Sequence, residues 1–267
     1  MQAAACGGRL GEAEVRGQGI GDSEELVSNR ARFRLRMIER LDAASKRAVD
    51  VTAAMTILLV LSPLIALLVL AIKLDSRGPA FYRCRRVGHR GREFAMLKFR
   101  KMRDGVGGPA LTSTDDERFT RLGRSLASTK LDEIPQLWNV LKGDMSLVGP
   151  RPEDPSFVAL DRHGYDPILQ VKPGITGLSQ LAFAIEPEIL DPTDRVGHYV
   201  KRILPQKMRL DALYAGRRSL GMDLRILGWT LAAVLLKRQV AVNRGTGYLS
   251  RRAPREPGVA PAMQTKA

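Results

Sequence analysis

Two adjacent carboxylates in the middle of the chain are the residues best suited to chemistry. Asp132 and Glu133 stand in the segment LDEIPQLWNVLKGDMSLVGPRPE, residues 131–153. An ionised carboxylate can attack phosphorus as a nucleophile or hold a metal ion. Acidic residues are also common in the first turn of a helix, where they only stabilise it. The pair alone therefore leaves a structural role open.

The spacing of apolar residues around this pair predicts the helix that positions it. Apolar residues recur at intervals of three and four, at Leu131, Ile134, Leu137, Trp138 and Leu141. This spacing predicts an amphipathic helix that Gly143 ends. Pro135 must lie in its first turn, because a deeper proline would clash with the carbonyl four residues back. Asp132 and Glu133 are then at the helix N-terminus, where the helix dipole favours ionised carboxylates.

A rigid cation follows the predicted helix. Arg151 stands between Pro150 and Pro152, which stiffen the backbone on both sides of it. A guanidinium held in this way suits bidentate contact with phosphate oxygens, although a structural role for a loop arginine is equally open. The segment VKPGITG, residues 171–177, adds a second rigid turn with Lys172 as a further cation.

The composition indicates an anionic partner. The formal charge is +15, and 44% of the residues are hydrophobic, which is ordinary for a folded protein. Such a charge fits nucleic acid, acidic lipid headgroups or phosphorylated small molecules. Cys6 and Cys84 are too few for a disulfide framework or a cysteine metal site, and the three histidines lack the spacing of zinc ligands.

An apolar segment predicts attachment to a membrane. Residues 51–72 carry no charge and are long enough, as a helix, to cover about 30 Å of hydrocarbon. Basic residues lie on both flanks, which places both ends on the cytoplasmic side. Ser62–Pro63 interrupts the segment in the middle, so we expect a re-entrant helix-break-helix in which the Ser62 hydroxyl satisfies backbone groups freed by the break. A kinked single span remains the alternative from the residues alone.

The rest of the chain divides into predicted segments. Residues 1–28 are expected to be a disordered lead, and 29–75 a basic amphipathic helix followed by the re-entrant membrane helix. Residues 76–240 would form a cytoplasmic catalytic domain, with a β-hairpin over residues 80–99 and an interfacial helix over 220–238. Residues 241–267 are expected to be a disordered basic tail. The predicted fold is mainly α with a small β-hairpin.

Several motifs in one order give the chain a family resemblance. They are KRAVD before the membrane segment, the Ser62–Pro63 break, LKFRKMR, LDEIPQLWNVLKGDMSLVGPRPE, VKPGITGL and RRSLGMDLRIL. Over residues 46–236 the chain resembles the monotopic bacterial sugar transferase family, the polyprenyl-phosphate phosphoglycosyltransferases that initiate glycan synthesis on undecaprenyl phosphate. The resemblance implies a monotopic protein of the bacterial cytoplasmic (inner) membrane, with its catalytic domain on the cytoplasmic face and a re-entrant rather than spanning helix.

The resemblance also implies a two-step reaction. Asp132 would attack the β-phosphate of a UDP-sugar and expel UMP, and polyprenyl phosphate would then take the sugar phosphate from the enzyme. Mg²⁺ would be the cofactor, held by Asp132 and Glu133, with Glu133 alternatively accepting a proton. The phosphate-binding residues would be Arg151, Lys98, Arg100 and Arg124. Anionic membrane lipids are expected partners, nucleic acid is not, and a homodimer is left open.

Three positions depart from the family pattern. Lys101 stands where the family usually has a small hydroxyl residue, Ala127 where it usually has a basic one, and Ser179-Gln180-Leu181 where it usually continues W-Q-V. These departures keep open a family member that has lost activity and serves as a scaffold. A membrane-anchored nucleic-acid-binding protein is a further alternative, which the lack of a nucleic-acid motif and the low aromatic content disfavour.

Overall fold

The computed structural model describes residue 37 and residues 41–108, 111–112, 116–184, 190–191, 193–236 and 239–251. The chain divides into two compact units, Met1–Val49 and Asp50–Ala267. In the first unit the described residues, Met37 and 41–49, are helical. The predicted disordered lead and most of the predicted basic helix lie outside the described residues.

The apolar segment forms two helices that meet at a bend. A helix over Leu41–Val60 is followed by α2, Ser62–Asp75, and the two helices are bent by 62°. Pro63 has no N–H for the carbonyl of Leu59, and the Ser62 hydroxyl donates a hydrogen bond to that carbonyl instead, at 2.8 Å. The helix is therefore interrupted where the sequence predicts, and a re-entrant path through a membrane stays a prediction.

Length and apolar content decide whether these helices could cross a bilayer. Among the described residues, no helix alone meets both requirements, whereas the bent pair meets them together.

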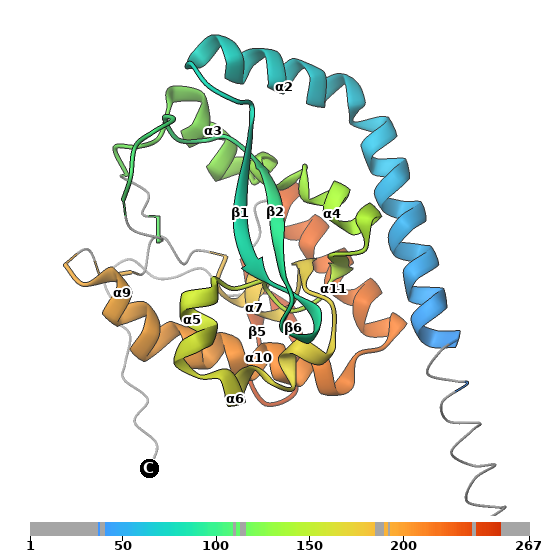
Figure 1. Ribbon diagram of the computed structural model, residues 1–267. Coiled ribbons are helices and arrows are strands. Elements are labelled where there is room, and N and C mark those ends of the chain that lie inside the picture. Colours follow the sequence, from blue (N-terminus) through green and yellow to red (C-terminus); the bar gives the residue numbers. More distant parts are fainter. Residues whose placement is uncertain are drawn as a thin grey trace, which may run out of the picture. The chain divides into compact units, whose positions relative to one another are not determined.

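The predicted β-hairpin is present. Strand β1, Phe81–Val87, pairs antiparallel with β2, Glu93–Phe99, and the connecting turn contains a short 3-10 helix over His89–Gly91. Positive φ angles occur in this turn at Arg90 and Gly91, whereas Gly88 is extended. At the turn end, the Val87 N–H donates to the carbonyl of Glu153 at 3.0 Å. Figure 1 shows α5 and α6 near this end and α3 near the open end.

Short helices and two small sheets make up the rest, so the expectation of a mainly α-helical fold is confirmed. The helices are α3 (Arg121–Thr129), α4 (Gln136–Lys142), α5 (Pro155–Leu160), α6 (Arg162–Tyr165), α7 (Leu178–Ala182), α9 (Arg195–His198), α10 (Leu204–Arg217) and α11 (Leu220–Leu235). Strands β3 (Ser146–Val148) and β4 (Gly174–Thr176) are parallel. Their pairing brings the VGPRP and VKPGITG segments side by side.

The prediction of a disordered tail from residue 241 is wrong for its first part. Strands β5, Val240–Val242, and β6, Leu249–Arg251, form an antiparallel hairpin. Val240 and Leu249 are buried in the largest hydrophobic cluster, which also contains Val148, Leu210 and Ile226. Burial of these side chains outweighs the polar composition of the turn. Residues 252–267 lie outside the described residues.

Helix α11 is mostly apolar but carries one acidic residue in its first turn. Its acidic residue, Asp223, is buried, and the Tyr214 hydroxyl donates a hydrogen bond to its Oδ1 atom at 2.6 Å. The Tyr214 hydroxyl also lies 3.0 Å from the carbonyl of Val148 at the end of β3. A carboxylate that would be costly in an apolar environment therefore connects α10, α11 and β3.

Candidate active site

Asp132 lies in a short 3-10 turn, Leu131–Glu133, and only 2% of its side chain is exposed. Its Oδ2 atom lies 3.0 Å from Nζ of Lys101, which follows β2. No described residue donates a hydrogen bond of good geometry to this oxygen. A buried carboxylate oxygen almost always accepts a hydrogen bond, so one whose described contact is an ion pair with Lys101 and no hydrogen bond marks a candidate functional atom.

The turn that carries Asp132 connects α3 to α4. Lys130 ends α3 in the left-handed conformation, with φ 61°, and the Glu133 N–H donates to its carbonyl. Pro135 directly precedes α4, and Gly143, with φ 91°, ends it as predicted. The helix therefore begins later than expected, and both carboxylates lie in the turn before it. Trp138 was expected on the apolar face but is 54% exposed.

Glu133 is held by a lysine of the hairpin. Its Oε1 atom lies 2.8 Å from Nζ of Lys98 on β2, and 19% of the Glu133 side chain and 13% of the Lys98 side chain are exposed. Burial alone would raise the pKa of Glu133. The charges of Lys98 and Arg151 and the Lys98 hydrogen bond outweigh burial and lower the pKa to about 2. Glu133 is therefore ionised at neutral pH.

Asn139 is a site-positioning residue that the sequence analysis missed. Its side chain is 1% exposed; Oδ1 accepts from the Leu97 N–H at 2.9 Å, and Nδ2 donates to the Ala95 carbonyl at 2.8 Å. These two bonds fix α4 to β2 at Ala95 and Leu97, and Leu97 directly precedes Lys98. A polar residue within a helix is typical of a solvent-facing position, so the sequence gave no signal for this contact.

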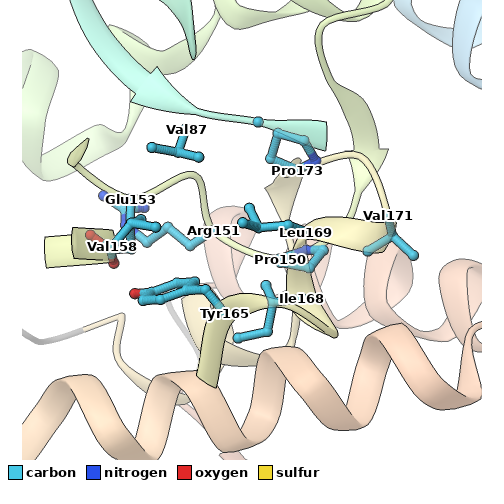
Figure 2. A pocket seen from close by; sticks show the side chains of 11 residues that line it. Val87, Pro150, Arg151, Glu153, Val158, Tyr165, Ile168, Leu169, Val171 and Pro173 are labelled. Carbon is cyan, nitrogen blue, oxygen red and sulfur yellow. The ribbon is translucent and has the colours of Figure 1, made fainter. Parts of the chain in front are cut away.

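Arg151 follows β3 and brings a third cation toward Glu133. Its charge acts on both Glu133 and Lys130. The side chain lines a small pocket together with Glu153 and Tyr165, as Figure 2 shows. Arg151 therefore adds positive charge at the carboxylate turn, and its role in phosphate binding stays a prediction.

The polar layer behind Arg151 is formed by side chains of α7 and α10, of the helical turn Tyr199–Ile203 and of Glu153. The Arg151 N–H donates to the Asp211 carboxylate, which also accepts from the Ser179 hydroxyl at 2.7 Å. The Tyr199 hydroxyl donates to Glu153 at 2.6 Å, and Lys207 donates to the Tyr199 hydroxyl at 3.2 Å. These buried contacts restrict the backbone that presents Arg151. The sequence analysis named Ser179 only as a departure from a pattern and did not find Asp211.

Comparison with known proteins shows which family the chain belongs to. The family model described as bacterial sugar transferase matches residues 41–237. The chain belongs to the bacterial sugar transferase family. This confirms the family and the transferase class predicted from the motifs.

Several relatives of this bacterial sugar transferase carry informative names. The undecaprenyl-phosphate glucose phosphotransferase of Komagataeibacter xylinus is 36% identical over 212 residues, which are 76% of this chain but 38% of the relative. The UDP-glucose:undecaprenyl-phosphate glucose-1-phosphate transferase of Caulobacter vibrioides is 38% identical over 195 residues, 71% of this chain and 69% of the relative. The exopolysaccharide production protein PSS of Rhizobium leguminosarum is 36% identical over 220 residues, 78% of this chain and 100% of the relative.

Two of the predicted phosphate-binding residues, Arg100 and Arg124, make no described contact with Asp132 or Glu133. The Arg100 guanidinium is buried and donates to the carbonyls of Ile72, Ser76 and Arg77 at the end of α2, at 3.2, 2.6 and 2.6 Å. Arg100 is therefore occupied in holding α2, and we remove it from the phosphate-binding set. Arg124 lies on α3 with an exposed side chain, and its role remains a prediction.

The predicted ligands of a metal ion are the two carboxylates Asp132 and Glu133. Among the described residues there is no group of three or more histidine, cysteine, aspartate or glutamate side chains that could hold a metal ion. Mg²⁺ in phosphoryl-transfer sites commonly uses only one or two carboxylates together with substrate phosphates and water. Asp132 Oδ2, buried and without a hydrogen bond, fits such a ligand, and Glu133 is its neighbour in the same turn.

Proposed function

We propose that this sugar transferase moves a sugar phosphate from a UDP-sugar to polyprenyl phosphate, with release of UMP. The observation that carries the proposal is the Asp132 carboxylate, which is buried at the turn between α3 and α4 and has an oxygen without a hydrogen bond. The names of the relatives support this class of donor and acceptor, because they include glucose-1-phosphate transferases acting on undecaprenyl phosphate. The product would begin an exopolysaccharide, a capsule, an O-antigen or another glycoconjugate.

The proposed chemistry proceeds in two displacements at phosphorus. A carboxylate oxygen of Asp132 forms a bond to the β-phosphorus of the donor, and the bond from that phosphorus to the bridging oxygen breaks, so UMP leaves with the electron pair. A phosphate oxygen of the polyprenyl phosphate then attacks the same phosphorus and releases the Asp132 carboxylate. The product is a polyprenyl diphosphate sugar, and the enzyme returns to its starting form.

The cations around the turn support this chemistry. Phosphoryl transfer is mostly positioning and charge neutralisation, because the carboxylate and the diphosphate repel each other. Arg151 would bind a phosphate of the donor, while Lys98 keeps Glu133 ionised and in place beside Asp132. Mg²⁺ held by Asp132 and Glu133 would add positive charge at the diphosphate when it is bound.

The direct test uses the nucleophile. The full-length chain in lipid nanodiscs is supplied with UDP-sugars and Mg²⁺, and UMP release is measured. We expect Asp132→Asn to lower the rate by at least about 10³-fold, because the amide cannot form the covalent bond. A radiolabelled donor should label the wild-type protein at position 132 when the acceptor is omitted. Equal UMP release by the variant would refute the role of Asp132.

We also propose that the chain is monotopic on the cytoplasmic face of the inner membrane. The two bent helices expose Leu59, Val60, Leu67 and Leu70, and α11 exposes a stripe formed by Leu220, Leu224, Leu231 and Leu235. Such contiguous apolar surfaces are costly in water. Beside the start of α11 a groove is lined by Arg217 and Arg225. These charges suit anionic lipid headgroups.

Labelling of introduced cysteines tests the topology. Cys6 and Cys84 are first replaced by serine, and single cysteines are placed at Ser45 and at Asp75, one on each side of the bend. In intact spheroplasts a membrane-impermeant maleimide should leave both positions unlabelled, and in inverted vesicles it should label both. Labelling of one position in each preparation would show that the helix pair spans the membrane.

A further inference from the structure

A lysine stands beside the proposed nucleophile. Nζ of Lys101 lies 3.0 Å from Oδ2 of Asp132, with 25% of the lysine side chain exposed. The same ammonium lies 5.8 Å from the centre of the Phe119 ring, close enough for a cation–π contact. The side chain is thus directed toward the carboxylate by contacts on two sides.

The backbone of Lys101 is fixed by the start of α3. The Thr120 N–H donates to the Lys101 carbonyl at 3.1 Å, and the Thr120 hydroxyl accepts from the Gly123 N–H at 2.9 Å. A Cβ atom at Gly123 would lie 1.8 Å from the Lys101 carbonyl oxygen, so only glycine allows this approach. The position of the lysine beside Asp132 is therefore built into the fold.

Each of the two carboxylates in this turn has its own lysine partner. Lys101 neutralises Asp132 and Lys98 neutralises Glu133. A divalent cation bound to Oδ2 would lie at about 2.1 Å from it and close to the ammonium, which would repel it. The ammonium and a divalent cation are therefore alternatives at this oxygen.

We propose that Lys101 is a resident cation at Asp132, which weakens binding of a divalent cation to the carboxylate pair until a diphosphate donor arrives. The inference rests on the proposed function, in which these carboxylates hold Mg²⁺. The negative charges of the donor attract the ammonium away from Asp132 and add phosphate ligands for the metal. Metal and donor therefore bind cooperatively, and Lys101 acts as a positioning residue for Asp132.

Metal binding without donor tests this directly. Mn²⁺ is titrated into the full-length protein in nanodiscs, and free Mn²⁺ is measured by electron paramagnetic resonance. Lys101→Met keeps an unbranched side chain, one atom shorter, and removes the charge, so we expect it to bind Mn²⁺ about tenfold more tightly than the wild type. Lys101→Arg should bind as weakly as the wild type, because the positive charge is retained.

A matched lysine provides the control. Lys142 pairs with Asp144 at 3.4 Å on the surface, and Lys142→Met should leave Mn²⁺ affinity unchanged. Adding Asp132→Asn to Lys101→Met should abolish the gain, and a gain that persisted would place the metal elsewhere and overturn the inference. An unchanged affinity in Lys101→Met, with the melting temperature showing a folded protein, would also overturn it.

The Mn²⁺ titration requires no turnover, so it tests this inference separately from the proposed function. Failure of the proposed function appears as unchanged UMP release in Asp132→Asn, whereas failure of the present inference appears in metal binding without any donor. Lys101→Gln, which is neutral but polar, replaces the methionine variant if that protein does not fold, and it should show the same tighter binding.

Discussion

The Glu133 carboxylate contributes to stability through its depressed pKa. The folded protein holds this pKa at about 2, below the ordinary value of 4.5. The contribution is therefore fully present above about pH 4.5 and is lost as the pH falls through 2. We expect Glu133→Gln to lower the free energy of unfolding at pH 7 by about 1–3 kcal/mol, because Lys98 is left largely buried opposite a neutral group. Thermal unfolding at several pH values measures the loss.

An exposed ion pair on the same hairpin serves as the comparison. Glu93 pairs with Arg85, and their side chains are 41% and 78% exposed. Solvent screens such pairs, so Glu93→Gln should change the stability by less than about 0.5 kcal/mol. Equal effects of the two substitutions would show that the Lys98–Glu133 pair is no more than a surface contact.

Arg100 has a structural role that its motif does not suggest. Its guanidinium satisfies three carbonyls at the end of α2, and the side chain is 5% exposed. We expect Arg100→Met to destabilise the protein by about 3 kcal/mol, because these carbonyls lose their donors. The KM for the UDP-sugar should stay unchanged in the fraction that folds. A rise in KM of about tenfold with normal stability would instead support a phosphate contact.

At the scale of single residues, the sequence predicts site residues that lie within one motif. It does not predict contact partners that come from distant parts of the chain. Asp132, Glu133 and Arg151 stand within one continuous segment, and the structure brings their charges together. The partners of Arg100 lie more than twenty residues earlier in the chain, and Asp211 reaches Arg151 from α10. Contacts over such separations depend on tertiary packing, which neither spacing nor residue type encodes.

At the scale of elements, the sequence predicted features that are caused by neighbouring residues. Pro63 removes a donor, and the neighbouring Ser62 replaces it, so the break between the two helices follows from two adjacent residues. The hairpin of β1 and β2 was predicted from two short strand-like segments within residues 80–99 and the turn that joins them. The start of α4 was placed too early, because the apolar spacing continues through the 3-10 turn that carries the carboxylates.

The attachment of the hairpin to α4 depends on Asn139. This side chain binds both Leu97 and Ala95 of β2. We expect Asn139→Ala to speed hydrogen exchange of the Leu97 amide by roughly tenfold or more, because a loss of about 1.4 kcal/mol or more in local stability is a factor of at least ten. Asn243→Ala, which removes a similar cap from the β5–β6 turn, should leave the exchange of Leu97 unchanged. Protection retained at Leu97 in Asn139→Ala would mean that the hairpin is held by other contacts.

At the scale of the whole molecule, one hydrophobic cluster gathers segments from most of the second unit. Ala54, Val140, Leu178, Leu210 and Ile226 are all at most 1% exposed within it. The same cluster orders the β5–β6 hairpin, although residues from 241 onward were predicted to be a disordered basic tail. The mainly α-helical class was predictable from periodicity, but the docking of a short C-terminal hairpin depends on the surface that the other elements create.

Burial of a carboxylate in this packed unit should make the stability depend on pH near neutrality. Burial raises the pKa of Asp211 to about 7, although the Ser179 hydrogen bond opposes the shift. Between about pH 4 and 7 the folded protein then keeps a proton that the unfolded chain has released. Stability therefore falls as the pH rises through this window, by up to about 1.4 kcal/mol per pH unit, and no further above it.

Substitution of Asp211 removes this dependence. The difference in unfolding free energy between Asp211→Asn and the wild type should grow from pH 5 to 7 and then stay constant. Ser179→Ala deletes a bond that favours the ionised form, so it should extend the falling range to higher pH. Urea unfolding at half-unit pH steps measures both effects, and parallel curves for all three proteins would show that Asp211 does not titrate in this range.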